Sequence, residues 1–151
     1  MFNPIALSAV TMLVSLFSFG LATGLLVQFV VHWLRKSHGK SQFWKNIAIL
    51  MILSMTMALV HLIQIGLWAL TIRLCGATST FEDAFYCSAQ NYTALGYGDI
   101  TLSEQWRLLG PLEAINGLLL FGLSSAVMFG VMSHLLANRI RAALGPEERR
   151  M

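Results

Sequence analysis

The sequence predicts an all-α membrane protein with three transmembrane helices and one short helix that re-enters the membrane. First, 56% of the 151 residues are hydrophobic and only 11% are charged, whereas a soluble domain carries about 25% charged residues. Second, three apolar runs each exceed the roughly 20 residues that a helix needs to cross a bilayer. Third, a segment between the second and third runs combines helix-capping residues with a glycine-rich turn.

The first apolar run extends from about Ile5 to Leu34 and contains no formally charged side chain. A secretory signal peptide is the competing interpretation, but it requires a basic n-region and a cleavage site, and neither is evident here. Trp33 and Arg35 form a typical interfacial end. We therefore expect a transmembrane helix within residues 1–35, followed by a basic cytoplasmic loop over residues 36–46.

The second run extends from about Ile47 to Ile72 and contains two polar side chains, His61 and Gln64. These residues are three positions apart, so they share one face of a helix. Polar groups at this depth in a membrane usually face other helices. We expect interhelical hydrogen bonds from both side chains, and a proton relay or ligand site is the alternative.

The third run extends from about Leu108 to Ala137, and its polar residues are Glu113, Asn116, Ser124 and Ser125. We expect Glu113 to lie behind the short helix and to form a hydrogen bond near the glycine-rich turn. Asn116 and Ser124 are expected to face a water-filled cavity.

The segment STFEDAFYCSAQNY between these runs predicts a helix too short to span the membrane. Ser79 or Thr80 can cap its N-terminus, and Ser79 with Glu82 has the spacing of a capping box. Two cysteines lie nearby, Cys75 and Cys87. They form a disulfide if the compartment is oxidising, and two buried free thiols are the other interpretation.

Basic residues predict the orientation of the chain. Lysine and arginine concentrate in the stretch RKSHGKSQFWK and in the tail NRIRAALGPEERR, and both belong on the cytoplasmic side. With three spans, the N-terminus and the segment from Leu74 to Arg107 then lie outside. We expect a multi-pass protein of the cell (inner) membrane with its C-terminus in the cytoplasm.

A glycine–tyrosine–glycine turn, Gly96-Tyr97-Gly98, directly follows the short helix. Irregular backbone at membrane depth must be buried in protein or line a water-filled cavity. A dehydrated cation needs oxygen ligands in place of its water, and backbone carbonyls supply them. Glycine tolerates the backbone angles that aim successive carbonyls at one axis. Four such turns around an axis complete a ring of carbonyls at each level, so we expect a homotetramer.

The stretch TALGYGDI, Thr93–Ile100, resembles the selectivity filter of potassium channels, whose usual form is Thr-Val-Gly-Tyr-Gly-Asp. The order of elements is similar to the pore domain of two-transmembrane, pore-loop channels of the bacterial type, with an extra N-terminal transmembrane helix. The resemblance covers the pore domain, residues 47–141. It implies an outer helix over 47–74, a pore helix over 80–92, a filter over 93–99 and an inner helix over 108–138, with 142–151 left as a short cytoplasmic tail.

The resemblance also implies which residues hold the permeant potassium ions, through backbone carbonyls: Ala94, Leu95, Gly96, Tyr97 and Gly98. It implies support of the filter by four more residues: Thr93, Asp99, Gln90 and Tyr86. Gln90 stands where the family often has a glutamate, so its pairing with Asp99 is expected to be weaker than a carboxyl pair that shares a proton. Gly117 and Gly122 are candidates for a gating hinge, and close helix packing is the alternative role.

The clearest departure from the family pattern is Ala94, which stands where the threonine hydroxyl usually helps to form the innermost ion site. Alanine keeps the carbonyl and removes the hydroxyl, so the innermost site is expected to be weaker. The resemblance thus implies selective potassium conduction, and two alternatives stay open. They are a weakly selective monovalent cation channel and a non-conducting, channel-like regulatory subunit.

The partners expected are membrane lipid and further copies of the chain, with no nucleic acid; a regulatory subunit is left open. No enzymatic activity is expected, because no nucleophile–base pair, HExxH or phosphate-binding loop is present in the sequence. No cofactor is expected besides the permeant potassium.

Overall fold

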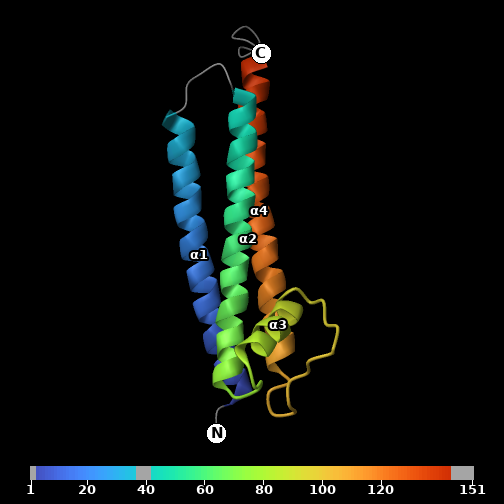
Figure 1. Ribbon diagram of the computed structural model, residues 1–151. Helices are drawn as coiled ribbons and strands as arrows, with labels where there is room; N and C mark the ends of the chain where they lie inside the picture. The colour runs from blue at the N-terminus through green and yellow to red at the C-terminus, as the bar shows by residue number, and fades with distance from the viewer. Residues whose placement is uncertain (1–2, 37–41, 144–151) are drawn as a thin grey trace.

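A computed structural model describes residues 3–36 and 42–143, and this part of the chain is all-helical (Figure 1). It contains four helices and no strand, which confirms the predicted fold class. The helices are α1 (Pro4–Lys36), α2 (Gln42–Leu74), α3 (Phe81–Tyr92) and α4 (Leu109–Ala143).

Three of these helices, α1, α2 and α4, are long and apolar enough to cross a membrane. The qualifying segments are Pro4–Trp33, Trp44–Leu74 and Leu109–Ala137. A single copy leaves large hydrophobic side chains exposed along all three helices, among them Phe17, Met55 and Phe129. Such surfaces are stable in contact with lipid or with other helices, so the protein is a multi-pass membrane protein.

The helices extend beyond the boundaries expected from the apolar runs. α2 begins at Gln42 rather than at residue 47, so residues 42–46 of the expected loop are helical. α4 continues to Ala143, past its expected end at 138. Neither extension contains a proline or glycine, and the sequence has Gly145-Pro146 two residues after the end of α4. Most of the expected tail, residues 144–151, lies outside the described residues.

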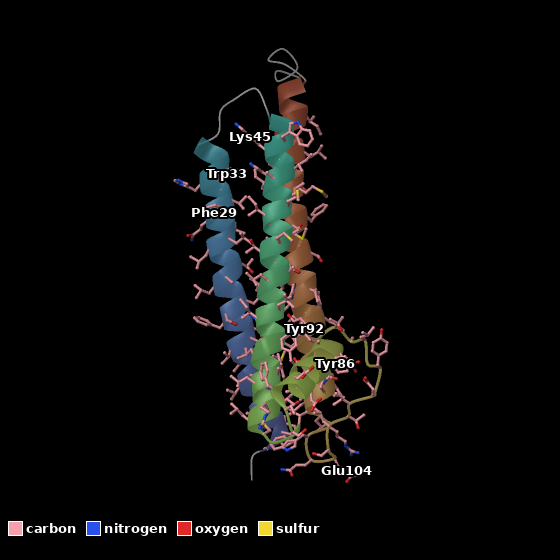
Figure 2. The ribbon with its side chains drawn as sticks, in the orientation of Figure 1. Phe29, Trp33, Lys45, Tyr86, Tyr92 and Glu104 are labelled. Atoms are coloured by element: carbon pink, nitrogen blue, oxygen red, sulfur yellow. The ribbon has the colours of Figure 1, made fainter. Side chains whose placement is uncertain are left out.

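The ends of the helices fall into two groups (Figure 1). The start of α1, the whole of α3 and the loop after α3 lie at one end of the bundle. The end of α1, the start of α2 and the end of α4 lie at the other end. Figure 2 shows the same separation, with Trp33 and Lys45 at one end and Tyr86 and Glu104 at the other. This arrangement agrees with three membrane crossings.

The interior of the bundle is divided into two apolar clusters. The larger one surrounds α3 and includes Trp68, Tyr92 and Leu120, each with no exposed surface. The smaller one lies farther along the long helices and includes Leu53 and Leu135. α3 packs against both α2 and α4, so its position is determined by the larger cluster.

A polar cluster inside the bundle joins α1 to its neighbours. Ser15 Oγ donates to Gln64 Oε1 at 2.7 Å, and Gln64 Nε2 donates to Ser18 Oγ at 3.1 Å. The interhelical hydrogen bonds expected for Gln64 are thereby confirmed. Asn116 Nδ2 donates to Ser15 Oγ at 2.8 Å, and its side chain is fully buried. The expectation that Asn116 faces a wet cavity is wrong, because α1 covers this face of α4.

Candidate functional site

The N-terminus of α3 is capped by Thr80. Thr80 Oγ1 accepts a hydrogen bond from the backbone nitrogen of Asp83 at 3.0 Å and donates to Asp83 Oδ2 at 2.7 Å. The reciprocal pair is therefore Thr80 with Asp83, and not the expected Ser79 with Glu82. Glu82 and Asp83 both lie in the first turn, where a negative charge is favoured by the helix dipole.

The C-terminus of α3 is closed by a Schellman motif that runs directly into the glycine-rich turn. The backbone nitrogen of Ala94 donates to the carbonyl of Asn91 and that of Leu95 donates to the carbonyl of Gln90, both at 2.9 Å. Ala94 has the left-handed φ of 56° that this motif requires. A left-handed residue with a Cβ costs about 1–2 kcal/mol, and a β-branched side chain would be more strained. Sequence reasoning missed this role, because glycine is the usual signal for it.

The backbone after the Schellman motif is irregular from residue 95 to 98. Gly96 and Gly98 have φ values of +59° and +80°, while Leu95 and Tyr97 do not have positive φ. The sign of φ thus alternates along residues 94–98. Alternating left- and right-handed angles turn successive N–H groups to one side of a chain and the carbonyls to the other. In a single copy the side chains of Leu95 and Tyr97 are 56% and 71% exposed.

Asp99 ties the end of this irregular segment back to α3. Tyr86 Oη donates to Asp99 Oδ2 at 2.8 Å, and Gln90 Nε2 donates to Asp99 Oδ1 at 2.7 Å. Figure 2 shows Tyr86 beside the loop. The structure therefore brings together three of the expected support residues. The hydrogen bonds from Gln90 and then Tyr86 hold the pKa of Asp99 below its ordinary value, and the hydrogen bond to Asp99 raises the pKa of Tyr86.

The link between Tyr86 and Asp99 predicts an acid-dependent difference. A lowered pKa means that the carboxylate contributes stability in full above its ordinary pKa of 3.8 and loses it as pH falls through the lowered value. In Tyr86→Phe one donor is absent, so the pKa of Asp99 lies closer to 3.8, the carboxylate contributes less stability, and that contribution is gone at a higher pH. We expect the variant to lose folded protein at a higher pH than the wild type in an acid titration followed by tryptophan fluorescence. Identical titrations would contradict the assigned hydrogen bond.

Thr93, the fourth expected support residue, binds back to α3. Its hydroxyl donates to the carbonyl of Ala89 at 2.6 Å, and it is the C-cap residue of the helix. Its side chain is therefore directed at the last turn of α3. Thr93 stabilises the junction between the helix and the irregular segment.

Glu113 lies fully buried behind α3, as expected from its position in the sequence. Ser88 Oγ lies 2.8 Å from the carbonyl of Ile65 and 2.5 Å from Glu113 Oε1, while Asn91 Nδ2 lies 3.4 Å from Glu113 Oε2. A serine hydroxyl has one hydrogen to donate, and a carbonyl can only accept. Both contacts of Ser88 are satisfied when Glu113 carries a proton and donates it to Ser88. The geometry therefore favours a neutral carboxylic acid.

The two candidate hinge glycines have different surroundings. A Cβ added at Gly117 would lie 2.0 Å from the carbonyl oxygen of Tyr92, whereas one added at Gly122 would meet no atom within 4 Å. Gly117 thus permits the end of α3 to lie directly against α4. The role of either glycine as a hinge stays a prediction.

Tyr92 is a residue of this site that sequence reasoning did not single out. Its hydroxyl lies 2.9 Å from His61 Nδ1, and His61 Nε2 lies 3.1 Å from Ser124 Oγ. The interhelical bonding expected for His61 is confirmed. Ser124 is buried against His61, so its expected place in a wet cavity is wrong.

A cavity of about 240 Å³ lies between α3, the irregular segment and the start of α4. Its lining includes Gln90 and Asn91 on one side, Gly96 and Gly98 on another, and Arg107. Cys87 also lines it, and both Cys75 and Cys87 are free thiols, so the disulfide alternative is not what the structure shows. The space behind the irregular segment is thus not filled by side chains of α3.

Comparison with known families gives one match. A family model described as an ion channel matches residues 47–134. The match includes most of α2, all of α3, the irregular segment and most of α4, and it leaves α1 outside. No curated protein and no solved structure gives a significant match to the chain.

Proposed function

Because the chain belongs to the ion channel family whose model matches residues 47–134, we propose that it conducts potassium selectively through a pore built by four copies. Membership in this family supports ion conduction, because its members are channels and not enzymes. The observation that carries the finer proposal is the alternation of φ over residues 94–98. An alternation of this kind can present successive carbonyls on one side, as a site for dehydrated cations requires.

The helix before the filter supports the same proposal. α3 ends at Tyr92, directly before the proposed ligands, which are the carbonyls of residues 94–98. The C-terminus of a helix carries a partial negative charge, which favours a cation at this point. Asp99, held by Tyr86 and Gln90, anchors the outer end of the filter to α3. The filter is therefore held at both ends.

The need for several copies follows from the number of loops. One chain supplies one irregular segment, and a ring of carbonyls around an axis needs four. The side chains of Leu95 and Tyr97 support this assembly. Both are large and exposed in a single copy, one aliphatic and one aromatic, and both belong to the segment that provides the proposed ion ligands. We propose a homotetramer in the inner membrane, with the N-terminus and the filter outside and the C-terminus in the cytoplasm.

A weakly selective cation channel is the second candidate, and Ala94 is the observation that favours it. The residue provides a carbonyl but no hydroxyl for the innermost ion site. The left-handed φ of this residue also disfavours a β-branched threonine in its place.

A flux experiment with two matched variants tests the proposal. Purified protein in liposomes is expected to pass potassium and to exclude sodium under equal gradients. Gly96→Val places a β-branched side chain at φ +59° and is expected to abolish selective flux, because valine is strongly disfavoured there. Leu95→Val introduces the same side chain one residue earlier, where φ is not positive, and is expected to keep selective flux.

The possible results separate the candidates. Equal potassium and sodium flux through the wild-type protein would support the weakly selective channel. Selective flux that survives in Gly96→Val would contradict the assignment of the filter. No cation flux from a verified tetramer under any gradient would contradict conduction and favour a regulatory subunit.

A further inference from the structure

His61 lies at the point where all four helices meet. Its ring stacks on Phe121 of α4, with centroids 4.2 Å apart and planes at 26°. The ring of Phe19 from α1 lies 5.7 Å away, and that of Tyr92 from α3 lies 5.9 Å away. Only 8% of His61 is exposed. Burial of a polar ring at such a depth costs free energy, so a ring in this place indicates a specific role.

The hydrogen bonds of His61 form a chain with a defined direction. Ser124 Oγ donates its one hydrogen to the carbonyl of Phe121 at 2.9 Å, so towards His61 it can only accept. His61 Nε2 must therefore carry a hydrogen and donate it to Ser124. The contacts of the ring are aromatic groups and hydroxyls, which favours a neutral imidazole. Nδ1 then accepts from the hydroxyl of Tyr92, and every donor in the chain is used.

This chain connects α4 to the residue that immediately precedes the filter. Tyr92 contacts α4 at its backbone, beside Gly117, and its side chain reaches Ser124 through His61. The ring of Phe121 lies between these points, 5.6 Å from the ring of Tyr92. Residues 117, 121 and 124 share one face of a helix, being spaced by four and three. Figure 2 shows Tyr92 at the junction of the helices.

We propose that His61 is a positioning residue that couples the orientation of α4 to the conducting geometry of the filter. The proposal rests on the proposed function, conduction through residues 94–98. A rotation of α4 that moves Ser124 from His61 leaves a buried donor unpaired, unless His61 and Tyr92 follow. Because Tyr92 is joined through Thr93 to the Schellman motif at Ala94, its displacement reaches the innermost carbonyls. α1 contacts the same point through Phe19, so the first helix can bias this coupling.

The test is a double-mutant cycle read in single-channel recordings of the reconstituted full chain. Tyr92→Phe and Ser124→Ala each remove one hydroxyl and keep the packing nearly unchanged. Each is expected to shift the ratio of open to closed times about threefold, the size of a typical interhelical hydrogen bond in a membrane. The double variant is expected to shift it no further than the single ones, because either change breaks the same chain. Ser125→Ala, at the exposed neighbouring serine, is the control and should leave the ratio unchanged.

A second pair of variants tests the ring itself. His61→Leu removes both the acceptor and the donor and is expected to gate like the double variant. His61→Gln keeps one acceptor and one donor and is expected to restore part of the wild-type ratio. Rescue of this kind does not follow from a role in packing alone, because leucine fills the buried site better than glutamine.

The outcomes distinguish this inference from the function on which it rests. Unchanged gating in Tyr92→Phe and Ser124→Ala, or fully additive shifts in the double variant, would overturn the coupling while conduction stands. Loss of stability with unchanged gating in His61→Leu would assign His61 to packing and also overturn it. A wild-type protein without any cation current would overturn the proposed function first, and the coupling with it.

Discussion

Gly117→Ala is expected to destabilise the protein and to abolish conduction, although alanine is the better helix former. The added Cβ would lie 2.0 Å from the carbonyl oxygen and 2.9 Å from the carbonyl carbon of Tyr92. Both atoms belong to the backbone, so no side-chain rotation relieves the overlap. Forcing an extra carbon into a packed site costs about 1–3 kcal/mol or more, while the change from glycine to alanine in a helix gains only about 1 kcal/mol.

The loss of conduction follows from the position of Tyr92. To admit the new Cβ, the end of α3 must move away from α4, and Tyr92 directly precedes the proposed filter. The hydrogen bonds that close the helix at Ala94 and Leu95 start from the same turn. A shift of this turn therefore displaces the innermost carbonyls even if the tetramer still assembles.

Gly122→Ala is the matched control for this prediction. No atom lies within 4 Å of a Cβ at this position, so the variant is expected to be as stable as the wild type or more stable by up to about 1 kcal/mol. Thermal unfolding in detergent and potassium flux in liposomes measure both variants. Wild-type stability of Gly117→Ala would contradict the close approach of α3 and α4. Normal stability together with altered gating in either variant would instead favour a hinge role for the glycine that was replaced.

Glu113→Leu is expected to destabilise the protein, while Glu113→Gln is expected to be nearly neutral. Leucine removes one of the two contacts of Asn91 Nδ2, which also lies 3.5 Å from Cys87 Sγ, and one of the two contacts of Ser88, inside a fully buried site. Each buried hydrogen bond lost in this way costs about 0.5–1.5 kcal/mol. Glutamine has a similar shape and supplies an amide donor for Ser88 and a carbonyl acceptor for Asn91, which are the roles of a protonated carboxyl.

The comparison of these two variants tests the protonation state as well as the position of Glu113. Thermal unfolding followed by tryptophan fluorescence and the fraction of assembled protein are the measurements. Equal destabilisation by both substitutions would show that the site requires an ionised carboxylate. Equal stability of Glu113→Leu and the wild type would show that Ser88 and Asn91 do not depend on Glu113. Glu104→Gln, at an exposed residue, controls for the removal of a carboxyl.

The glycines of the turn could be assigned from the sequence because their requirement is local. Gly96 and Gly98 were expected to have angles that other residues avoid, and both have a positive φ. The pairing of Asp99 with Tyr86 and Gln90 was also accessible, because the resemblance of the stretch to potassium-channel filters implied it. The left-handed Ala94 was not accessible, because alanine does not normally signal that conformation.

The sequence by itself determined the three membrane-crossing helices, the short helix between them and the glycine-rich turn. These depend on apolar length, on capping residues and on the backbone freedom of glycine, which are all properties of contiguous stretches. Only the tertiary structure decided the partners of the polar residues inside the bundle. Asn116 and Ser124 were expected to face a cavity, and they bind Ser15 and His61 instead. The reason is that a helix that is almost entirely apolar has no amphipathic pattern in its sequence. The face that packs against neighbouring helices therefore cannot be identified from the sequence. Which polar groups meet is therefore settled by how the helices pack.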